Sequence, residues 1–322
     1  MFKTLNLICA AGLLLAACGG NPQLRDYAVP KQAAELSELP FLPENEAQGA
    51  PAAVATVLAA TDLQVTPEAL KEQIYDAATG SSPREAVLAA TRRSGRIAYV
   101  LQSPTIDLDA VKEVQAGHPV LVLLRLGTFR REWRYAVMVG VDPAANQFIL
   151  RMGQQKRALM SYGELLRAWA GSEYWAMVAV KPSADPASLP ATAQVDSWVA
   201  AAEPFAALGQ ADIGVQADLA ATRRWPKEIK AWTALGKVRQ LAGDSSGAIL
   251  AYATAASLAP DNAELHVHLA EALHDRQCFE QAADEINKAV TLETDPVRQA
   301  GDQQAARDYQ WSEGPSAYCQ LD

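Results

Sequence analysis

A 34-residue period in the C-terminal part of the chain is the strongest constraint on its fold. Trp232 recurs as His266 one period later and as Trp198 one period earlier, and Leu235 recurs as Leu269. A period of this length is typical of a helix pair that can bury its apolar face only by stacking on neighbouring pairs. We therefore predict an all-α solenoid in this part of the chain.

The predicted solenoid covers residues 195–322. Its units are 195–228, 229–262 and 263–296, followed by a C-terminal cap over 297–322. The pattern resembles TPR repeats, and the first unit matches it most weakly. The resemblance implies a concave surface that receives helices or chain ends of a protein partner.

The first residues of the chain predict a secretion signal. Lys3 precedes an apolar run of 13 residues from Leu5 to Ala17, which is too short to cross a bilayer as a helix. The run ends in Leu15-Ala16-Ala17-Cys18, which resembles the lipobox of bacterial lipoproteins. An ordinary signal peptide, or an apolar start of the chain, is the alternative.

The lipobox resemblance implies that the chain is cleaved before Cys18 and acylated on that residue. Residues 1–17 would be the signal peptide, and residues 18–38 a polar tether that joins the lipid to the first domain. Gly19, rather than Asp, follows the cysteine. This implies a lipoprotein of the outer membrane that faces the periplasm.

The net charge limits the class of partner, and the cysteine content indicates a possible disulfide. The chain has 322 residues and a formal net charge of −9, which argues against nucleic acid as a partner. Without the signal peptide, Cys278 and Cys319 are the cysteines left besides Cys18. In an oxidising compartment they form either one disulfide or two buried free thiols.

Residues 39–182 carry helix signals first and strand signals later. Pro51 stands in the first turn of an Ala/Val-rich helix, Thr66 is a helix N-cap, and Ser82 with Glu85 forms an expected capping box. The expected strands are 96–101, 119–126, 133–141, 147–151, 157–160 and 174–180, with helices from Asp107 to Gly117 and from Ser161 to Ala170. This order predicts an α+β domain. Residues 183–194, which contain two prolines, are expected to be a linker.

The start of this domain resembles the active-site helix of papain-like cysteine peptidases. The similar family is the bacteriocin-processing type, which cleaves double-glycine leaders, in its lipoprotein branch with C-terminal TPR repeats. The family's Gly-Pro-Ala-Ala falls on Ala50-Pro51-Ala52-Ala53. Its nucleophilic cysteine falls on Gly49, and its oxyanion glutamine falls on Glu44.

The second half of the domain carries the same resemblance. Trp133-Arg134-Tyr135-Ala136-Val137 looks like the family strand Trp-His-Tyr-Ala-Val, whose histidine is the general base. That histidine falls on Arg134. The family's third catalytic residue, Asp or Asn, falls within 151–153, which offers no carboxylate. The resemblance therefore implies a papain-like fold that has lost its catalytic residues.

We expect no catalytic residue in this domain, and we regard Glu44, Gly49 and Arg134 as vestigial positions. Glycine has no nucleophile, a guanidinium cannot accept a proton at neutral pH, and a carboxylate repels an oxyanion. Glu44 and Arg134 are predicted to form an ion pair across the cleft. Two alternatives remain: an active cysteine peptidase, and a scaffold in which only the repeats bind. A capped helix of an unrelated fold is a third.

No cofactor is expected. His266, His268, His274 and Cys278 suggest a metal site, because His274 and Cys278 are four residues apart. We interpret them instead as core and surface residues of the repeats and expect no metal. The predicted partners are a peptide or protein of the cell envelope and, through the lipid anchor, a membrane.

Overall fold

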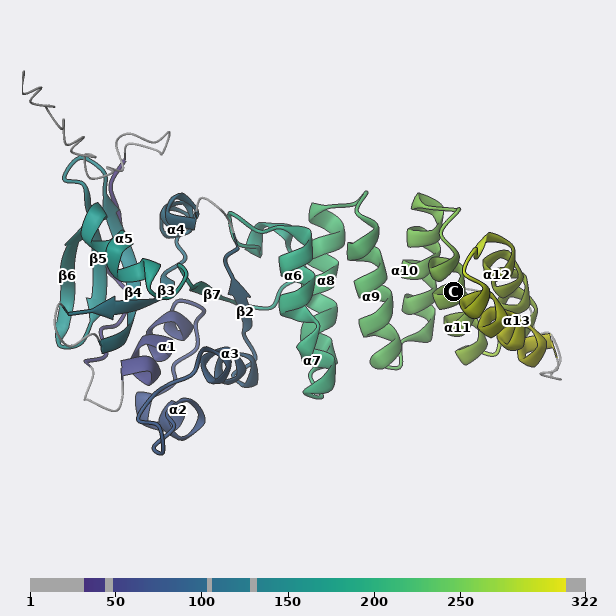
Figure 1. Ribbon diagram of the computed structural model, residues 1–322, viewed down its shortest axis with the longest axis horizontal. Coiled ribbons are helices and arrows are strands. Elements are labelled where there is room, and N and C mark those ends of the chain that lie inside the picture. The colour runs from purple at the N-terminus through teal and green to yellow at the C-terminus, as the bar shows by residue number, and fades with distance from the viewer. Residues whose placement is uncertain (1–31, 44–48, 103–105, 128–131, 311–322) are drawn as a thin grey trace, which may run out of the picture.

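The computed structural model describes residues 32–43, 49–102, 106–127 and 132–310. Its sheet is antiparallel, with strand order β2-β7-β3-β4-β5-β6 and with β1 paired to β4 (Figure 1). The strands are β1 (Ala34–Glu35), β2 (Ile97–Val100), β3 (Val120–Leu126), β4 (Glu132–Asp142), β5 (Gln147–Met152), β6 (Gln155–Ser161) and β7 (Ala176–Val180). The strands expected from the sequence are present.

Helices cover both faces of this sheet. The first domain contains α1 (Gly49–Ala59), α2 (Pro67–Ile74), α3 (Arg84–Arg93), α4 (Ile106–Gln115) and α5 (Tyr162–Ala170). Figure 1 shows α1, α2 and α3 on one side of the sheet and α4 and α5 on the other. Each side has its own buried core: Val54, Leu70 and Val137 belong to the first, and Val111 and Met138 to the second. An α+β domain is confirmed.

Two helices of this domain begin with a side-chain N-cap, and at two other helices the N-cap predicted from the sequence is not formed. The Thr66 hydroxyl accepts a hydrogen bond from Ala69 N, and Ser161 forms a full capping box with Glu164. The capping box predicted at Ser82 is wrong. Helix α3 begins at Arg84 after Pro83, which is extended and makes no side-chain cap. The cap predicted at Asp107 is also wrong, since α4 begins one residue earlier, at Ile106.

The C-terminal half is a stack of helix pairs that runs away from the sheet (Figure 1). Its helices are α6 (Val195–Ala202), α7 (Pro204–Ala207), α8 (Ala211–Arg224), α9 (Ile229–Leu241), α10 (Ser245–Leu258), α11 (Ala263–Asp275), α12 (Phe279–Leu292) and α13 (Pro296–Gln310). The predicted all-α solenoid is confirmed. Among the described residues, no helix is both long enough and apolar enough to cross a membrane.

Equivalent residues of two repeats make the same contact. Trp232 Nε1 donates to the Pro226 carbonyl at 2.9 Å, and His266 Nε2 is 3.0 Å from the Pro260 carbonyl. Each contact spans six residues, and the two lie one 34-residue period apart. The periodicity in the sequence is therefore a periodicity of structure.

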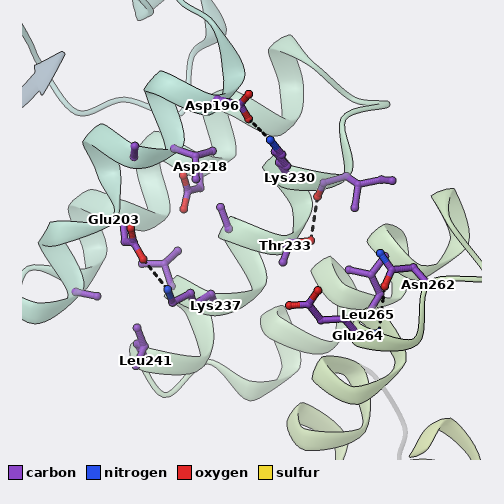
Figure 2. Close-up of a pocket in the computed structure, with 16 residues that line it drawn as sticks. Asp196, Glu203, Asp218, Lys230, Thr233, Lys237, Leu241, Asn262, Glu264 and Leu265 are labelled. Carbon is purple, nitrogen blue, oxygen red and sulfur yellow. Dashed lines mark hydrogen bonds and ion pairs between the residues drawn. The ribbon is translucent and has the colours of Figure 1, made fainter. Parts of the chain in front are cut away.

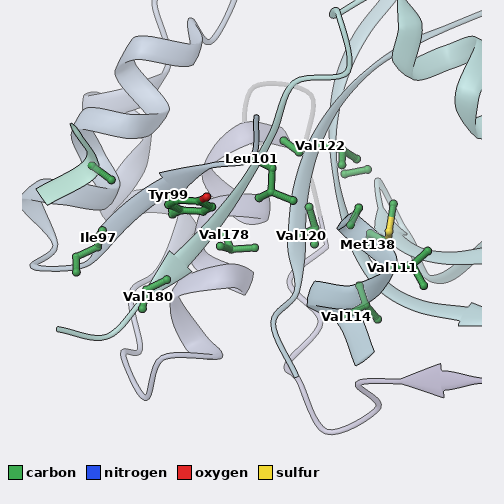
Figure 3. Packing of buried hydrophobic residues seen from close by; sticks show 14 of the residues in the cluster. Ile97, Tyr99, Leu101, Val111, Val114, Val120, Val122, Met138, Val178 and Val180 are labelled. Carbon is green, nitrogen blue, oxygen red and sulfur yellow. The ribbon is translucent and has the colours of Figure 1, made fainter. Parts of the chain in front are cut away.

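The two domains share one continuous core. The cluster on the α4 side of the sheet, part of which Figure 3 shows, includes Tyr99 from β2 and also Trp198 and Phe205 from the first repeat. The rings of Tyr99 and Trp198 are 6.2 Å apart between centroids. Burial of a shared apolar surface of this kind fixes the first repeat against the edge of the sheet.

The segment 183–194 is more ordered than a free linker. It contains the short 3-10 helix η2 (Pro186–Ser188), and the Leu189 side chain is buried in the shared core. The Glu113 carboxylate of α4 accepts hydrogen bonds from Thr192 N at 2.7 Å and Thr192 Oγ1 at 2.6 Å. Glu113 is fully buried, which shows that the segment closes over it.

The expected tether of residues 18–38 ends earlier than predicted, because its last part belongs to the domain. Ala34 and Glu35 form β1 against Gly140 and Val141. A Cβ on Gly140 would lie 2.9 Å from the Ala34 carbonyl oxygen, so only glycine lets β1 approach this closely. Residues 18–31 lie outside the described residues.

Candidate functional site

The cleft that the sequence indicates is present as a cavity. Gly49, the first residue of α1, and Arg134, on β4, line the same cavity of about 670 Å³. Ser82 and Trp133 also line it. The chain therefore brings together the positions that match the nucleophile and the base of papain-like peptidases. The Glu44 position, and with it the predicted Glu44–Arg134 ion pair, lies outside the described residues.

Arg134 stands at the mouth of the cleft. Its side chain is 40% exposed, and its Nη2 atom is 3.6 Å from Glu132 Oε2. An ion pair as exposed as this one contributes little to stability. The guanidinium supplies positive charge near the N-terminus of α1, which favours anionic groups in the cleft.

The polar groups that line the cleft include hydroxyls, phenols and charged side chains, and the Thr79 hydroxyl donates to the Asp76 carboxylate at 2.9 Å. The lining includes Tyr135, whose hydroxyl donates to the Ser82 carbonyl at 3.0 Å. Burial raises the pKa of Tyr135, so its phenol stays protonated at neutral pH. Neither a cysteine nor a histidine occurs among these lining residues.

The position of the family's third catalytic residue has a structural role. Arg151 is buried on β5, and its guanidinium donates to the carbonyls of Leu39 and Pro40 and, at 3.1 Å, to that of Leu36. Burial lowers the pKa of Arg151, and the nearby Glu35 opposes that shift. The arginine therefore holds the segment that leads into α1, a role that the sequence analysis missed.

A second cavity lies in the repeats. The sequence predicted a concave surface there but did not identify its lining residues. It measures about 590 Å³ and is lined by the first helices of the successive pairs, α6, α9 and α11 (Figure 2). We call this cavity the groove. Its lining residues are Asp196, Val199, Ala200, Glu203, Ala206, Asp218, Ile229, Lys230, Thr233, Ala234, Lys237, Val238, Leu241, Asn262, Glu264 and Leu265.

The groove combines apolar walls with ordered charges. Lys230 Nζ is 2.6 Å from Asp196 Oδ1, and Lys237 Nζ is 2.6 Å from Glu203 Oε1 (Figure 2). Both pairs join residues 34 positions apart, so they bridge equivalent places of the first and second repeats. That spacing was visible in the sequence and could have identified the charged walls. Leu241, at one end, is 63% exposed.

Asp218 is the unusual residue of the groove. It comes from α8, lines the cavity and is only 3% exposed. Burial, with a smaller contribution from the Glu203 charge, raises the pKa of Asp218 to about 8. Among the residues that the structure describes, Asp218 Oδ1 has no hydrogen-bond partner. A buried carboxyl oxygen without a donor is unfavourable and rare in native structures.

The histidines of the repeats take part in separate contacts. His266 Nδ1 is 2.7 Å from Glu285 Oε2, His268 stacks on Tyr252, and His274 stacks on Tyr309. The sequence placed His274 and Cys278 on one helix face. That is wrong, because α11 ends at Asp275 and Cys278 is the N-cap of α12.

Cys278 is disulfide-bonded. Its partner lies outside the described residues, as does Cys319, so the pairing of these two cysteines stays a prediction. The lipid attachment site Cys18 also lies outside the described part of the chain.

Comparison with known proteins gives distant structural likeness only. No family model and no curated protein matches the chain. A C39-like peptidase from Bacillus anthracis covers 47% of this chain and 98% of its own, with 17% identity and a TM-score of 0.38. The type III secretion translocator chaperone SycD of Yersinia enterocolitica covers 36% of this chain and 83% of its own, with 17% identity and a TM-score of 0.34.

The MamA protein covers 36% of this chain and 64% of its own, with 14% identity and a TM-score of 0.32. Scores this low carry no argument about function. The peptidase-like and repeat architectures described above therefore rest on the strands, helices and repeats of this chain itself.

Proposed function

We propose that this chain is a non-catalytic, lipid-anchored envelope protein that binds a protein or peptide partner. The repeats hold the partner in the groove, and the peptidase-like domain serves as a second binding surface or as a platform. The protein would act as an adaptor in an envelope assembly or export system. The observation that carries this proposal is the groove, which offers apolar walls and ordered charges at the inner face of α6, α9 and α11.

The groove has the properties of a site for a chain segment. A cavity of about 590 Å³ is of the size that accepts several side chains, and its apolar lining supplies the driving force for burial. The Asp196–Lys230 and Glu203–Lys237 pairs supply both signs of charge along its walls. Such charges orient a partner and favour its association.

The cleft supports a binding role rather than catalysis. Covalent catalysis by a thiol needs a thiolate, a base and an oxyanion donor. Gly49 and Arg134 stand where the family has the first two, and neither side chain can do that chemistry. The cavity remains, so extended chain could still lie in it.

The lipid anchor is proposed from the sequence. The Leu15-Ala16-Ala17-Cys18 run and the apolar segment before it support cleavage before Cys18 and acylation of its sulfur. Metabolic labelling with an alkynyl fatty acid should mark the wild-type chain and leave Cys18→Ala unlabelled. Equal labelling of the two would remove the anchor from the proposal.

Site-specific photocrosslinking in cells tests the binding role. A benzophenone amino acid replaces Leu241 in the groove, and a matched variant carries it at Leu250, a similarly exposed leucine on α10 that does not line the cavity. We expect a discrete crosslinked protein from position 241 and none of that mass from position 250. Identical patterns from the two positions would argue against binding in the groove.

A peptidase assay distinguishes the proposed binding protein from the main alternative, an active cysteine peptidase. The purified protein is incubated with double-glycine leader peptides, and the products are analysed by mass spectrometry. Our proposal expects intact peptides after prolonged incubation. Cleavage after the double glycine that persists in a repurified preparation would establish an active enzyme instead.

A further inference from the structure

The structure singles out Asp218 when the repeats are superposed by their 34-residue period. The equivalent positions are Tyr252 in the second repeat and Ile286 in the third, which are 2% and 1% exposed. Both side chains belong to the hydrophobic cores between helices. An apolar side chain therefore suits this position of the repeat, and packing gives no reason for a carboxyl group in the first unit.

The carboxyl group of Asp218 borders the groove. Asp218 lines the cavity together with Val199, Val238 and Lys237, and Figure 2 shows it below the Asp196–Lys230 pair and beside Glu203. Aspartate is smaller than the tyrosine and isoleucine at the equivalent positions of the other repeats, so Asp218 also leaves room in the groove. Lys237, the nearby cation, is held by Glu203 at 2.6 Å rather than by Asp218.

The charges of the lining point to a basic guest. Four acidic side chains line the groove, from α6, from the junction of α6 with α7, from α8 and from α11, and two lysines of α9 line it with them. Both lysines are already paired, with Asp196 and with Glu203. Of the other two acids, Glu264 is 79% exposed and lies 3.8 Å from His268 Nε2, whereas Asp218 is buried at the floor of the groove and has no basic partner among the described residues. A donor that reaches Asp218 must be slender and enter through apolar walls.

We propose that Asp218 selects the guest of the groove: a chain segment in which a lysine, flanked by apolar residues, places its ammonium on the Asp218 carboxylate. The long methylene stem of lysine packs along Val199 and Val238, and the ammonium reaches the part of the Asp218 carboxyl group that lines the cavity. Bound ammonium favours the ionised carboxyl, so binding releases a proton where Asp218 is protonated beforehand. This inference rests on the proposed binding role of the groove.

Selection of peptides from a random 12-residue display library tests the inference. The mature chain without its lipid serves as bait, as wild type, Asp218→Asn, Leu241→Glu and the control Glu280→Gln, an exposed acid on α12 away from the groove. We expect wild type and Glu280→Gln to enrich one lysine at a fixed position between apolar residues. Asp218→Asn should lose that lysine while it still enriches the apolar residues.

The strongest selected peptide is then synthesised with its lysine and with norleucine in that place. Wild type should bind the lysine form at least 10-fold more tightly than the norleucine form, and Asp218→Asn should bind the two alike within about 3-fold. Circular dichroism confirms that each variant is folded. A norleucine peptide that binds wild type equally well would overturn the role of Asp218.

The Leu241→Glu variant distinguishes binding in the groove from selection of a lysine by Asp218. If this variant loses the peptides but the enriched sequences lack a lysine, the groove binds and the role of Asp218 is wrong. If wild type enriches no peptide that depends on Leu241, the proposed function of the groove fails, and the inference about Asp218 fails with it.

Discussion

Glu113 and Thr192 join the two domains through a fully buried carboxylate. Glu113 accepts from Thr192 N and Thr192 Oγ1, and also from Ala191 N at 3.1 Å, while His118 Nδ1 lies 2.7 Å from Glu113 Oε2. The segment that precedes the repeats is thereby fixed to α4. The orientation of the groove relative to the cleft follows from this contact and from the shared core around Tyr99 and Trp198.

Replacement of Glu113 should therefore destabilise the whole chain. Glu113→Ala removes a fully buried carboxylate and the four hydrogen bonds that Thr192, Ala191 and His118 make with it, and we expect the free energy of unfolding to fall by about 3–5 kcal/mol. The control Asp109→Ala, on the same helix, removes a carboxylate that pairs with one exposed side chain, Lys112, and should cost clearly less than Glu113→Ala. Urea unfolding followed by tryptophan fluorescence measures both; equal effects would contradict the role of Glu113.

The same carboxylate gives a pH dependence. Burial by itself would raise the pKa of Glu113, but the hydrogen bonds from His118 and Thr192 outweigh burial, and the pKa lies below its usual 4.5. A lowered pKa in the folded state means that this stabilisation is present above about pH 4.5 and is lost as the pH falls further. The difference in stability between wild type and Glu113→Gln should shrink below that pH. A constant difference down to pH 3 would contradict this explanation.

Asp218 should impose the opposite pH dependence. Its raised pKa, from 3.8 to about 8, means that the folded state binds the proton more tightly, so the cost to folding is absent at low pH and grows as the pH rises toward 8. The charged groups that line the cavity with it are Asp196 from α6, Glu203 at the junction of α6 with α7, Lys230 and Lys237 from α9, and Glu264 from α11. Asp218→Asn should be more stable than wild type by a few kcal/mol at pH 8 and by much less at pH 4. Thermal melts of the two chains at both pH values test this; a gap that does not widen with pH would count against it.

Gly140 should be required for the docking of β1. A Cβ there would lie 2.8 Å from Ile149 Cδ1 and 2.9 Å from the Ala34 carbonyl, so Gly140→Ala should displace β1 at a cost of about 1–3 kcal/mol. Hydrogen exchange should then be faster in Ala34–Glu35. The control Gly301→Ala meets no atom within 4 Å and should leave stability the same or slightly higher. Unchanged exchange in Gly140→Ala would show that β1 does not depend on this close approach.

A cysteine placed at Gly49 should behave as a thiol at a helix N-terminus. The α1 N-terminus and the nearby Arg134 guanidinium both favour the thiolate, so the pKa of the Gly49→Cys thiol should lie below about 8. The pH dependence of iodoacetamide labelling measures it, with the exposed helix-interior variant Gly301→Cys as control. A Gly49→Cys thiol that titrates like the control, near 8.5, would show that the cleft no longer resembles a peptidase site.

The sequence predicted the elements better than the long-range contacts. Regular apolar spacing and the 34-residue period depend on neighbours along the chain, and the helices and strands that they predict are present. The Ser82 capping box was wrong because the N-cap of α3 is Pro83, one residue later, which has no side-chain group to cap the helix; the Ser82 carbonyl instead accepts from Tyr135, 53 residues away. Ser161 and Glu164 have the same residue pattern and do form the capping box, because Ser161 itself is the N-cap of α5.

The candidate sites also differ in how far the sequence could predict them, according to whether they depend on a local pattern or on contacts between distant residues. A motif could place Gly49 and Arg134 in one cleft. The hydrogen bonds from Arg151 to the carbonyls of Leu39 and Pro40 join residues more than one hundred positions apart and leave no local pattern. Asp218 did leave a signal, because it breaks the apolar pattern of Tyr252 and Ile286. That it lines a cavity depends on the distance between α8 and the neighbouring helices, which only the folded chain reveals.

The most direct test of the account measures the affinity of the protein that is crosslinked at position 241. That partner is purified and titrated by calorimetry against wild type, Leu241→Glu in the groove and Leu250→Glu on α10. We predict at least a 10-fold weaker affinity for Leu241→Glu, an unchanged affinity for Leu250→Glu, and a partner that remains uncleaved. Equal affinity of all three chains, or cleavage of the partner during the titration, would contradict a non-catalytic binding function of the groove.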